Sequence, residues 1–174
     1  MTAPLILSAL FGPADFGYLD GLRRAHFPAE RNVIAAHLTM FHHLPPSVAD
    51  ELERRVAELC RAPAPKAVLA EPINLGRGVA LRVRSPELAE MRAELAEAFA
   101  TMLTPQDGQG WRAHVTIQNK VRPEEARALL AALQADWRER PVAIVGLAGW
   151  WYRDGPWELA FKRSFRGVGW GFGW

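Results

Sequence analysis

The pattern of apolar and polar positions divides the chain into short strands and amphipathic helices. An unbroken apolar run, as at residues 5–11, indicates a buried strand, and the following Gly12–Pro13 ends it. Apolar residues at helical spacing, such as Val48, Leu52 and Val56, indicate a helix with one buried face. Strands are expected at residues 5–11, 33–44, 68–75, 79–84, 111–121, 142–152 and 157–165, and helices at 14–28, 47–61, 85–102 and 123–138.

Several expected strands follow one another through turns of hairpin length. The segments Gly76-Arg77-Gly78 and Asp154-Gly155-Pro156 are two such turns. Because short turns join antiparallel strands, the pattern predicts an α+β fold with mostly antiparallel sheets flanked by helices, and not a doubly wound parallel sheet. Residues 104–110 are expected to form a polar loop. Residues 167–174, where glycine alternates mainly with aromatic residues, fit neither a helix nor a strand.

A four-residue pattern of histidine, apolar residue, threonine and apolar residue occurs twice. It spans residues 37–40 (His-Leu-Thr-Met) and residues 114–117 (His-Val-Thr-Ile), which lie 77 positions apart (114 − 37). The same offset aligns a proline and core leucines that follow each copy. A duplicated unit with pseudo-twofold symmetry would place the two strands side by side. The prediction is one domain over 1–174, with two lobes and an internal repeat around 37–59 and 114–136.

The strand period places the polar residues of each copy on one face. Side chains alternate between faces, so His37 and Thr39 are expected on one side of their strand, and His114 and Thr116 on the matching side of theirs. A single histidine in a strand is ordinary, but two in matching patterns are better explained by a shared cleft. The four side chains are therefore the candidate catalytic residues.

Three further side chains could meet a substrate in that cleft. Lys120 shares the strand face of His114, and His43 shares that of His37 if the strand stays regular. Arg77, between two glycines of a turn, could reach the mouth of the cleft. The alternative for each is an ordinary polar position at the surface.

Composition and charge restrict the possible partners. Lys and Arg number 21 against 19 Asp and Glu, a net charge of +2, which is too small an excess for the long basic stripe that binds duplex nucleic acid. A nucleotide or an RNA end, which needs only a few focused cations, is permitted.

No apolar run approaches the roughly 18–20 residues that cross a bilayer, and the N-terminus lacks a signal-peptide pattern, so a cytoplasmic protein without membrane association is expected. The single cysteine, Cys60, cannot form an internal disulfide.

Two opposed imidazoles suit in-line phosphoryl chemistry. One takes a proton from the attacking hydroxyl or water, and the other gives a proton to the leaving oxygen; the ordinary pKa of histidine, near 6.5, allows both states at neutral pH. The threonine hydroxyls can donate to the non-bridging phosphate oxygens. This chemistry needs no metal or cofactor, and no Cys/His cluster in the sequence has the spacing of a zinc site.

The two tetrads resemble the paired signatures of the 2H phosphoesterase superfamily, and most closely those of its bacterial 2'-5' RNA ligase / RNA 2',3'-cyclic phosphodiesterase branch. The resemblance runs from the first strand to the last and implies a two-lobed α+β fold with the cleft between the lobes. It implies that His37, Thr39, His114 and Thr116 are catalytic, with His114 as the base and His37 as the acid. The implied reaction opens a 2',3'-cyclic phosphate to the 2'-phosphate, and some members join or cut 2'-5' linkages. The tail from Gly167 onwards does not match the family pattern.

The function expected from the sequence is thus a metal-independent cyclic phosphodiesterase acting on an RNA end or a 2',3'-cyclic nucleotide. Reversible 2'-5' RNA ligation would use the same site, and no obligate protein partner is expected. Two alternatives stay open: a nucleotide- or RNA-end-binding module with little turnover, and a 2H phosphodiesterase for another cyclic or linear phosphodiester. Two intact His–Thr pairs favour an enzyme, because binding alone does not require two proton carriers.

Overall fold

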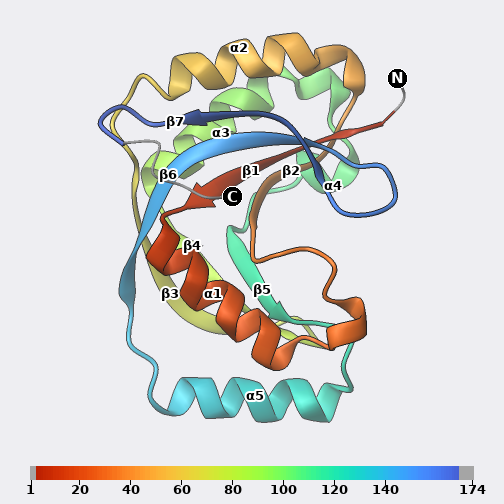
Figure 1. Ribbon diagram of the computed structural model, residues 1–174, viewed down its shortest axis with the longest axis vertical. Coiled ribbons are helices and arrows are strands. Elements are labelled where there is room, and N and C mark those ends of the chain that lie inside the picture. The colour runs from red at the N-terminus through yellow and green to blue at the C-terminus, as the bar shows by residue number, and fades with distance from the viewer. Residues whose placement is uncertain (1–2, 169–174) are drawn as a thin grey trace.

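Within residues 3–168, seven strands form one sheet in which every hydrogen-bonded pair is antiparallel (Figure 1). The computed structural model describes residues 3–168. The strand order is β2-β1-β6-β3-β4-β5, with β7 paired to β6 beside this path. The strands are β1 (Leu5–Phe11), β2 (Leu38–Leu44), β3 (Lys66–Asn74), β4 (Val79–Arg84), β5 (His114–Gln118), β6 (Arg140–Trp151) and β7 (Glu158–Ser164). The fold is therefore α+β with an antiparallel sheet flanked by helices, as the sequence pattern predicts.

In the part of the chain that the structure describes, five α-helices flank the sheet. They are α1 (Pro13–His26), α2 (Ala49–Leu59), α3 (Pro86–Ala98), α4 (Pro105–Gly108) and α5 (Pro123–Ala135). Figure 1 shows α2 and α3 together near one end of the molecule and α5 at the opposite end, while α1 packs against β5. The 3-10 turns Ala29–Arg31, Pro46–Val48 and Ala100–Met102 lie between these elements. None of the helices in the described residues is long and apolar enough to span a bilayer.

The long strand β6 joins two groups of strands. Its residues 140–143 pair with β3, whereas residues 144–151 pair with β1 and, in part, with β7. The strands β2 and β5 stand at the two ends of the strand order, so they do not pair with each other as the repeat had suggested. They nevertheless contact each other, because the sheet curves and brings its two ends together. A strand followed by a helix occurs in both repeat segments, as β2–α2 and as β5–α5.

The sequence pattern is wrong about residues 33–37, which precede β2 as a loop. The polar groups of α1 hold this loop instead of a neighbouring strand. The amide of Ala36 donates to Asp20 Oδ1 at 3.0 Å, and Arg23 Nε donates to the side chain of Asn32 at 2.7 Å. Because these bonds replace strand pairing, the apolar residues of the segment do not extend β2.

The expected polar loop at 104–110 contains the short helix α4. Thr104 caps it by accepting a hydrogen bond from the amide of Asp107, and Pro105 occupies its first turn. The same arrangement begins α3, where Ser85 accepts from the amide of Leu88 and Pro86 follows. Residues 169–174, which form most of the glycine- and aromatic-rich C-terminal tail, lie outside the described residues.

Candidate active site

A cavity of about 730 Å³ is lined by residues from β2 and β5. All four side chains of the two His–Thr pairs line it: His37, Thr39, His114 and Thr116. His37 directly precedes β2, and His114 is the first residue of β5, so each pair lies at the start of one of the outer strands. The curvature of the sheet thus brings together two segments that stand at opposite ends of the strand order.

The two histidines are held in the same way. The Nδ1 of His37 lies 2.9 Å from the carbonyl oxygen of Ala35, and the Nδ1 of His114 lies 2.7 Å from that of Arg112. A carbonyl oxygen only accepts, so Nδ1 carries the hydrogen in both rings. Each Nε2 is therefore left as the atom that can accept or donate a proton.

The surroundings of His37 disfavour its protonated form. Its ring packs against that of Trp157, with centroids 4.7 Å apart and planes tilted by 59°. Burial lowers the pKa of His37 from 6.5 to about 4, and the positive charges of Arg23, His114 and His42 act in the same direction, against the Ala35 carbonyl. His37 is therefore neutral at pH 7 in the free protein.

Arg23 of α1 links the loop before β2 to β5. It is buried, and its Nη1 donates to the backbone carbonyl of Thr116 at 2.9 Å. Its guanidinium also lies 4.2 Å from the centre of the Phe27 ring. Through its second bond to Asn32, Arg23 connects the loop that precedes His37 to the Thr116 end of the other His–Thr pair. The sequence pattern placed Arg23 in the expected helix at 14–28 and gave it no part in the site.

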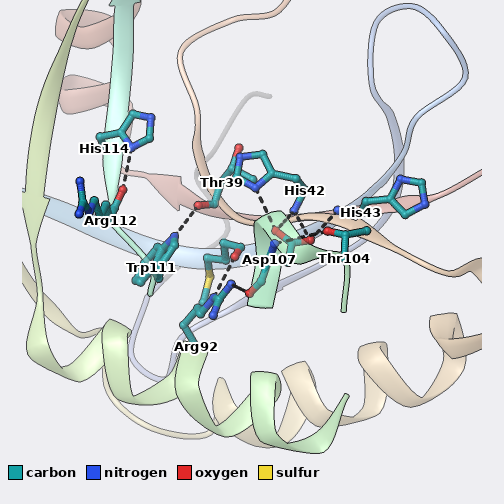
Figure 2. A network of polar contacts seen from close by, with 10 residues as sticks. Thr39, His42, His43, Arg92, Thr104, Asp107, Trp111, Arg112 and His114 are labelled. Carbon is teal, nitrogen blue, oxygen red and sulfur yellow. Dashed lines mark hydrogen bonds and ion pairs between the residues drawn. The ribbon is translucent and has the colours of Figure 1, made fainter. Parts of the chain in front are cut away.

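A third histidine, His42, also lines the cavity, although the sequence favoured its neighbour His43. The strand β2 contains one residue more than β1 between Thr39 and Phe41, which pair with Ser8 and Leu7, and a second extra residue between Phe41 and Leu44. Such a bulge shifts the alternation of faces by one position. The extra residue between Thr39 and Phe41 places His42 on the same face as Thr39, toward the cavity, whereas the ring of His43 points away from it (Figure 2).

Asp107 of α4 anchors the bulge between Phe41 and Leu44. Its carboxylate is 1% exposed and accepts hydrogen bonds from the backbone amides of His42 and His43 and from His42 Nδ1, which lies 3.0 Å away. Burial favours a raised pKa for Asp107, but the bonds from His42 and His43 prevail and lower it. Asp107 is thus an ionised, fully bonded carboxylate behind the cavity wall. The capping sequence Thr104-Pro105 was the signal that could have placed it on a helix.

Arg92 and Trp111 support the backbone of β2 from below (Figure 2). Arg92 is buried and donates to the carbonyls of Met40 (3.1 Å) and Asp107 (2.6 Å). The indole of Trp111 donates to the carbonyl of Thr39 at 3.0 Å. These bonds hold the Thr39 segment in place. The sequence did not indicate this role for either side chain.

The other three residues expected at the substrate do not line the cavity. The strand β5 ends at Gln118, and Lys120 follows in the left-handed region (φ 62°), so it does not continue the face of His114. Arg77 donates from Nε to the carbonyl of Val121 at 3.2 Å. His43 is exposed on the far side of the bulge.

Among residues 3–168, no group of three or more His, Cys, Asp or Glu side chains is arranged to hold a metal ion. The acidic residue among those that line the cavity is Asp107, whose oxygens already accept the bonds described above. The polar groups that face the cavity are therefore imidazoles, hydroxyls, amides and guanidinium groups.

Comparisons with known proteins agree with this architecture. The family model of the 2'-5' RNA ligase superfamily matches residues 11–156. Among solved structures, E. coli LigT in complex with 3'-AMP is similar at a TM-score of 0.64 and 15% identity, covering 95% of this chain and 99% of that one. TT0787 of Thermus thermophilus is similar at a TM-score of 0.59 and 16% identity, covering 96% and 99%. A structure described as a phosphoesterase is similar at a TM-score of 0.59 and 13% identity, covering 95% of this chain and 99% of that one. No curated protein matches the sequence significantly.

Proposed function

This chain belongs to the 2'-5' RNA ligase superfamily, and from that premise we propose that it is a metal-independent phosphodiesterase that opens 2',3'-cyclic phosphates at RNA ends or on small nucleotides. The fold and family support an activity of the phosphoesterase type. The observation that carries the finer proposal is that both His–Thr pairs line one cavity, with each imidazole fixed through Nδ1.

The proposed reaction is an in-line displacement at phosphorus. A water oxygen attacks, one histidine Nε2 takes its proton, the bond from phosphorus to the 3'-oxygen breaks, and the other histidine protonates that oxygen. The product is the 2'-phosphate. Thr39 and Thr116 donate to the two non-bridging oxygens and hold phosphorus between the rings. An RNA 5'-hydroxyl in place of water would give a 2'-5' linkage by the same path.

Two considerations bear on the roles of the histidines. The lowered pKa of His37 supports it as the base, because a base must be neutral before the reaction. The resemblance to the 2H family supports the opposite assignment, with His114 as the base. A substrate whose leaving group needs no proton, such as a 4-nitrophenyl phosphodiester, separates the two. The variant that lacks the acid should keep far more of its activity on this substrate than the variant that lacks the base.

An apolar pocket next to the cavity supports a nucleotide substrate. It has a volume of about 200 Å³ and shares His37 and Trp157 with the main cavity, while Ile34 and Trp150 contribute further apolar surface. An aromatic surface beside a phosphate site suits a nucleobase. E. coli LigT, which has a similar fold, has been crystallised with 3'-AMP, which is in keeping with this use of the fold.

Analysis of the product tests the proposed reaction. Incubation with adenosine 2',3'-cyclic phosphate, followed by phosphorus NMR, should show adenosine 2'-phosphate. A pure 3'-phosphate would mean that the 2'-oxygen leaves, and it would overturn the proposed orientation. Recovery of unchanged substrate with this compound and with a cyclic-phosphate-terminated RNA would refute the phosphodiesterase itself.

A further inference from the structure

We propose that His42 binds a second phosphate of the substrate, beside the one that His37 and His114 flank. The site would then be built for an RNA end whose last nucleotide carries a 5'-phosphate, and not for a nucleoside cyclic phosphate alone. This inference rests on the proposed function, because it takes His37 and His114 as the pair that flanks the reacting phosphate.

The ring of His42 has a fixed orientation. Its Nδ1 lies 3.0 Å from Oδ1 of Asp107, a carboxylate that is 1% exposed. An ionised carboxylate only accepts, so Nδ1 carries a hydrogen and the ring cannot turn over without leaving that carboxylate unpaired. Figure 2 shows the other ring nitrogen, Nε2, directed away from Asp107 on the side where Thr39 lies.

The free edge of the ring is accessible and suited to an anion. The side chain of His42 is 42% exposed and lines the same cavity as the two His–Thr pairs. In the protonated ring, Nε2 donates a charge-assisted hydrogen bond to a phosphate oxygen, while Asp107 balances the positive charge from behind. The proposed reaction requires only two proton carriers, His37 and His114, so His42 remains available to bind the substrate.

The rest of the wall favours negative charge. Asp107 is the one carboxylate among the described lining residues, and it is covered. Arg112 and the amide side chains of Gln106 and Gln109 line the same space. A volume of about 730 Å³ exceeds what a single phosphate fills. In an RNA end, the nearest anion after the cyclic phosphate is the 5'-phosphate of the same nucleotide.

A pair of matched variants isolates the cavity-facing edge of the ring. In His42→Asn the amide nitrogen can replace Nδ1 as the donor to Asp107, but nothing replaces Nε2. His43→Asn is the control, because His43 also gives its backbone amide to Asp107 while its ring points away from the site. Both variants should melt at the temperature of the wild type.

Isothermal titration with adenosine 2'-phosphate and adenosine 2',5'-bisphosphate tests the proposal. The wild type and His43→Asn should bind the bisphosphate roughly 10- to 100-fold more tightly than the monophosphate, the worth of one charge-assisted hydrogen bond. In His42→Asn the two affinities should converge. Equal affinities in the wild type, or an equal loss for both ligands in His42→Asn, would overturn the second phosphate site. A bisphosphate preference that depends on His42 in a protein that turns over no cyclic phosphate would uphold this site and refute the proposed reaction.

Discussion

The indole of Trp157 packs against the imidazole of His37, with ring centroids 4.7 Å apart. Trp157 lies just before β7, and His37 lies just before β2, so the contact joins two segments that are distant in the sequence. It shields one face of a candidate catalytic histidine from water. The low pKa of His37 follows mainly from such burial.

Replacing Trp157 by alanine is therefore expected to raise the pKa of His37 from about 4 toward 6.5. Water would reach the ring and stabilise its protonated form. NMR titration of the His37 ring protons measures the shift. Leu159→Ala is the control, because Leu159 is an exposed apolar residue of β7. An unchanged pKa in Trp157→Ala would show that other groups keep the ring neutral.

The pH dependence of kcat/KM is expected to be bell-shaped, because one histidine must be neutral and the other protonated in the free enzyme. The acidic limb should lie near pH 4, where His37 changes its charge. The sign of the Trp157→Ala effect follows: a raised pKa of His37 moves this limb to higher pH. If the acidic limb stays in place in Trp157→Ala while the NMR-measured pKa of His37 shifts, the ionisation of His37 does not determine this limb.

Asp107→Ala is expected to lower the free energy of unfolding by roughly 2–3 kcal/mol, because the part-buried backbone amides of His42 and His43 lose their acceptor. Urea denaturation followed by circular dichroism measures the change. Asp136→Ala, at the exposed end of α5, removes the same group without a buried amide and should differ from the wild type by less than about 0.5 kcal/mol. Equal stabilities of the two variants would contradict the anchoring of the β2 bulge by Asp107.

Activity is expected to survive chelation. The proposed reaction uses two imidazoles for proton transfer and two hydroxyls to orient the phosphate, so no step draws on a metal ion. The rate on a 2',3'-cyclic nucleotide after prolonged treatment with EDTA measures this. A rate that falls with EDTA and returns with a divalent ion would show that the two-histidine mechanism is incomplete.

Much of the fold could be predicted from the sequence because local patterns govern it. Apolar runs and helical spacing located all seven strands and four of the five α-helices of residues 3–168, with boundaries that differ by a few residues at most ends. The loop at 33–37 was misjudged because the side chains of Asp20 and Arg23 hold it, and such contacts between distant residues leave no periodic signal.

The sequence also indicated the two His–Thr pairs, since they recur in a repeat, and the structure places them in one cavity. Their catalytic roles stay a prediction. The regular alternation of faces favoured His43 over His42, because the bulges that reverse this choice form only where β2 pairs with β1. Asp107 lies 65 residues from His42, and no local pattern connects the two.

The most direct test of the two-histidine site is the turnover number of His37→Ala and His114→Ala on a 2',3'-cyclic nucleotide or a cyclic-phosphate-terminated RNA. Each substitution is expected to lower kcat at least about 100-fold, the usual contribution of a general acid or base. His26→Ala, which changes a histidine at the end of α1 outside the residues that line the cavity, should keep the wild-type rate. Wild-type turnover in either of the first two variants, with their folds intact by circular dichroism, would contradict the account.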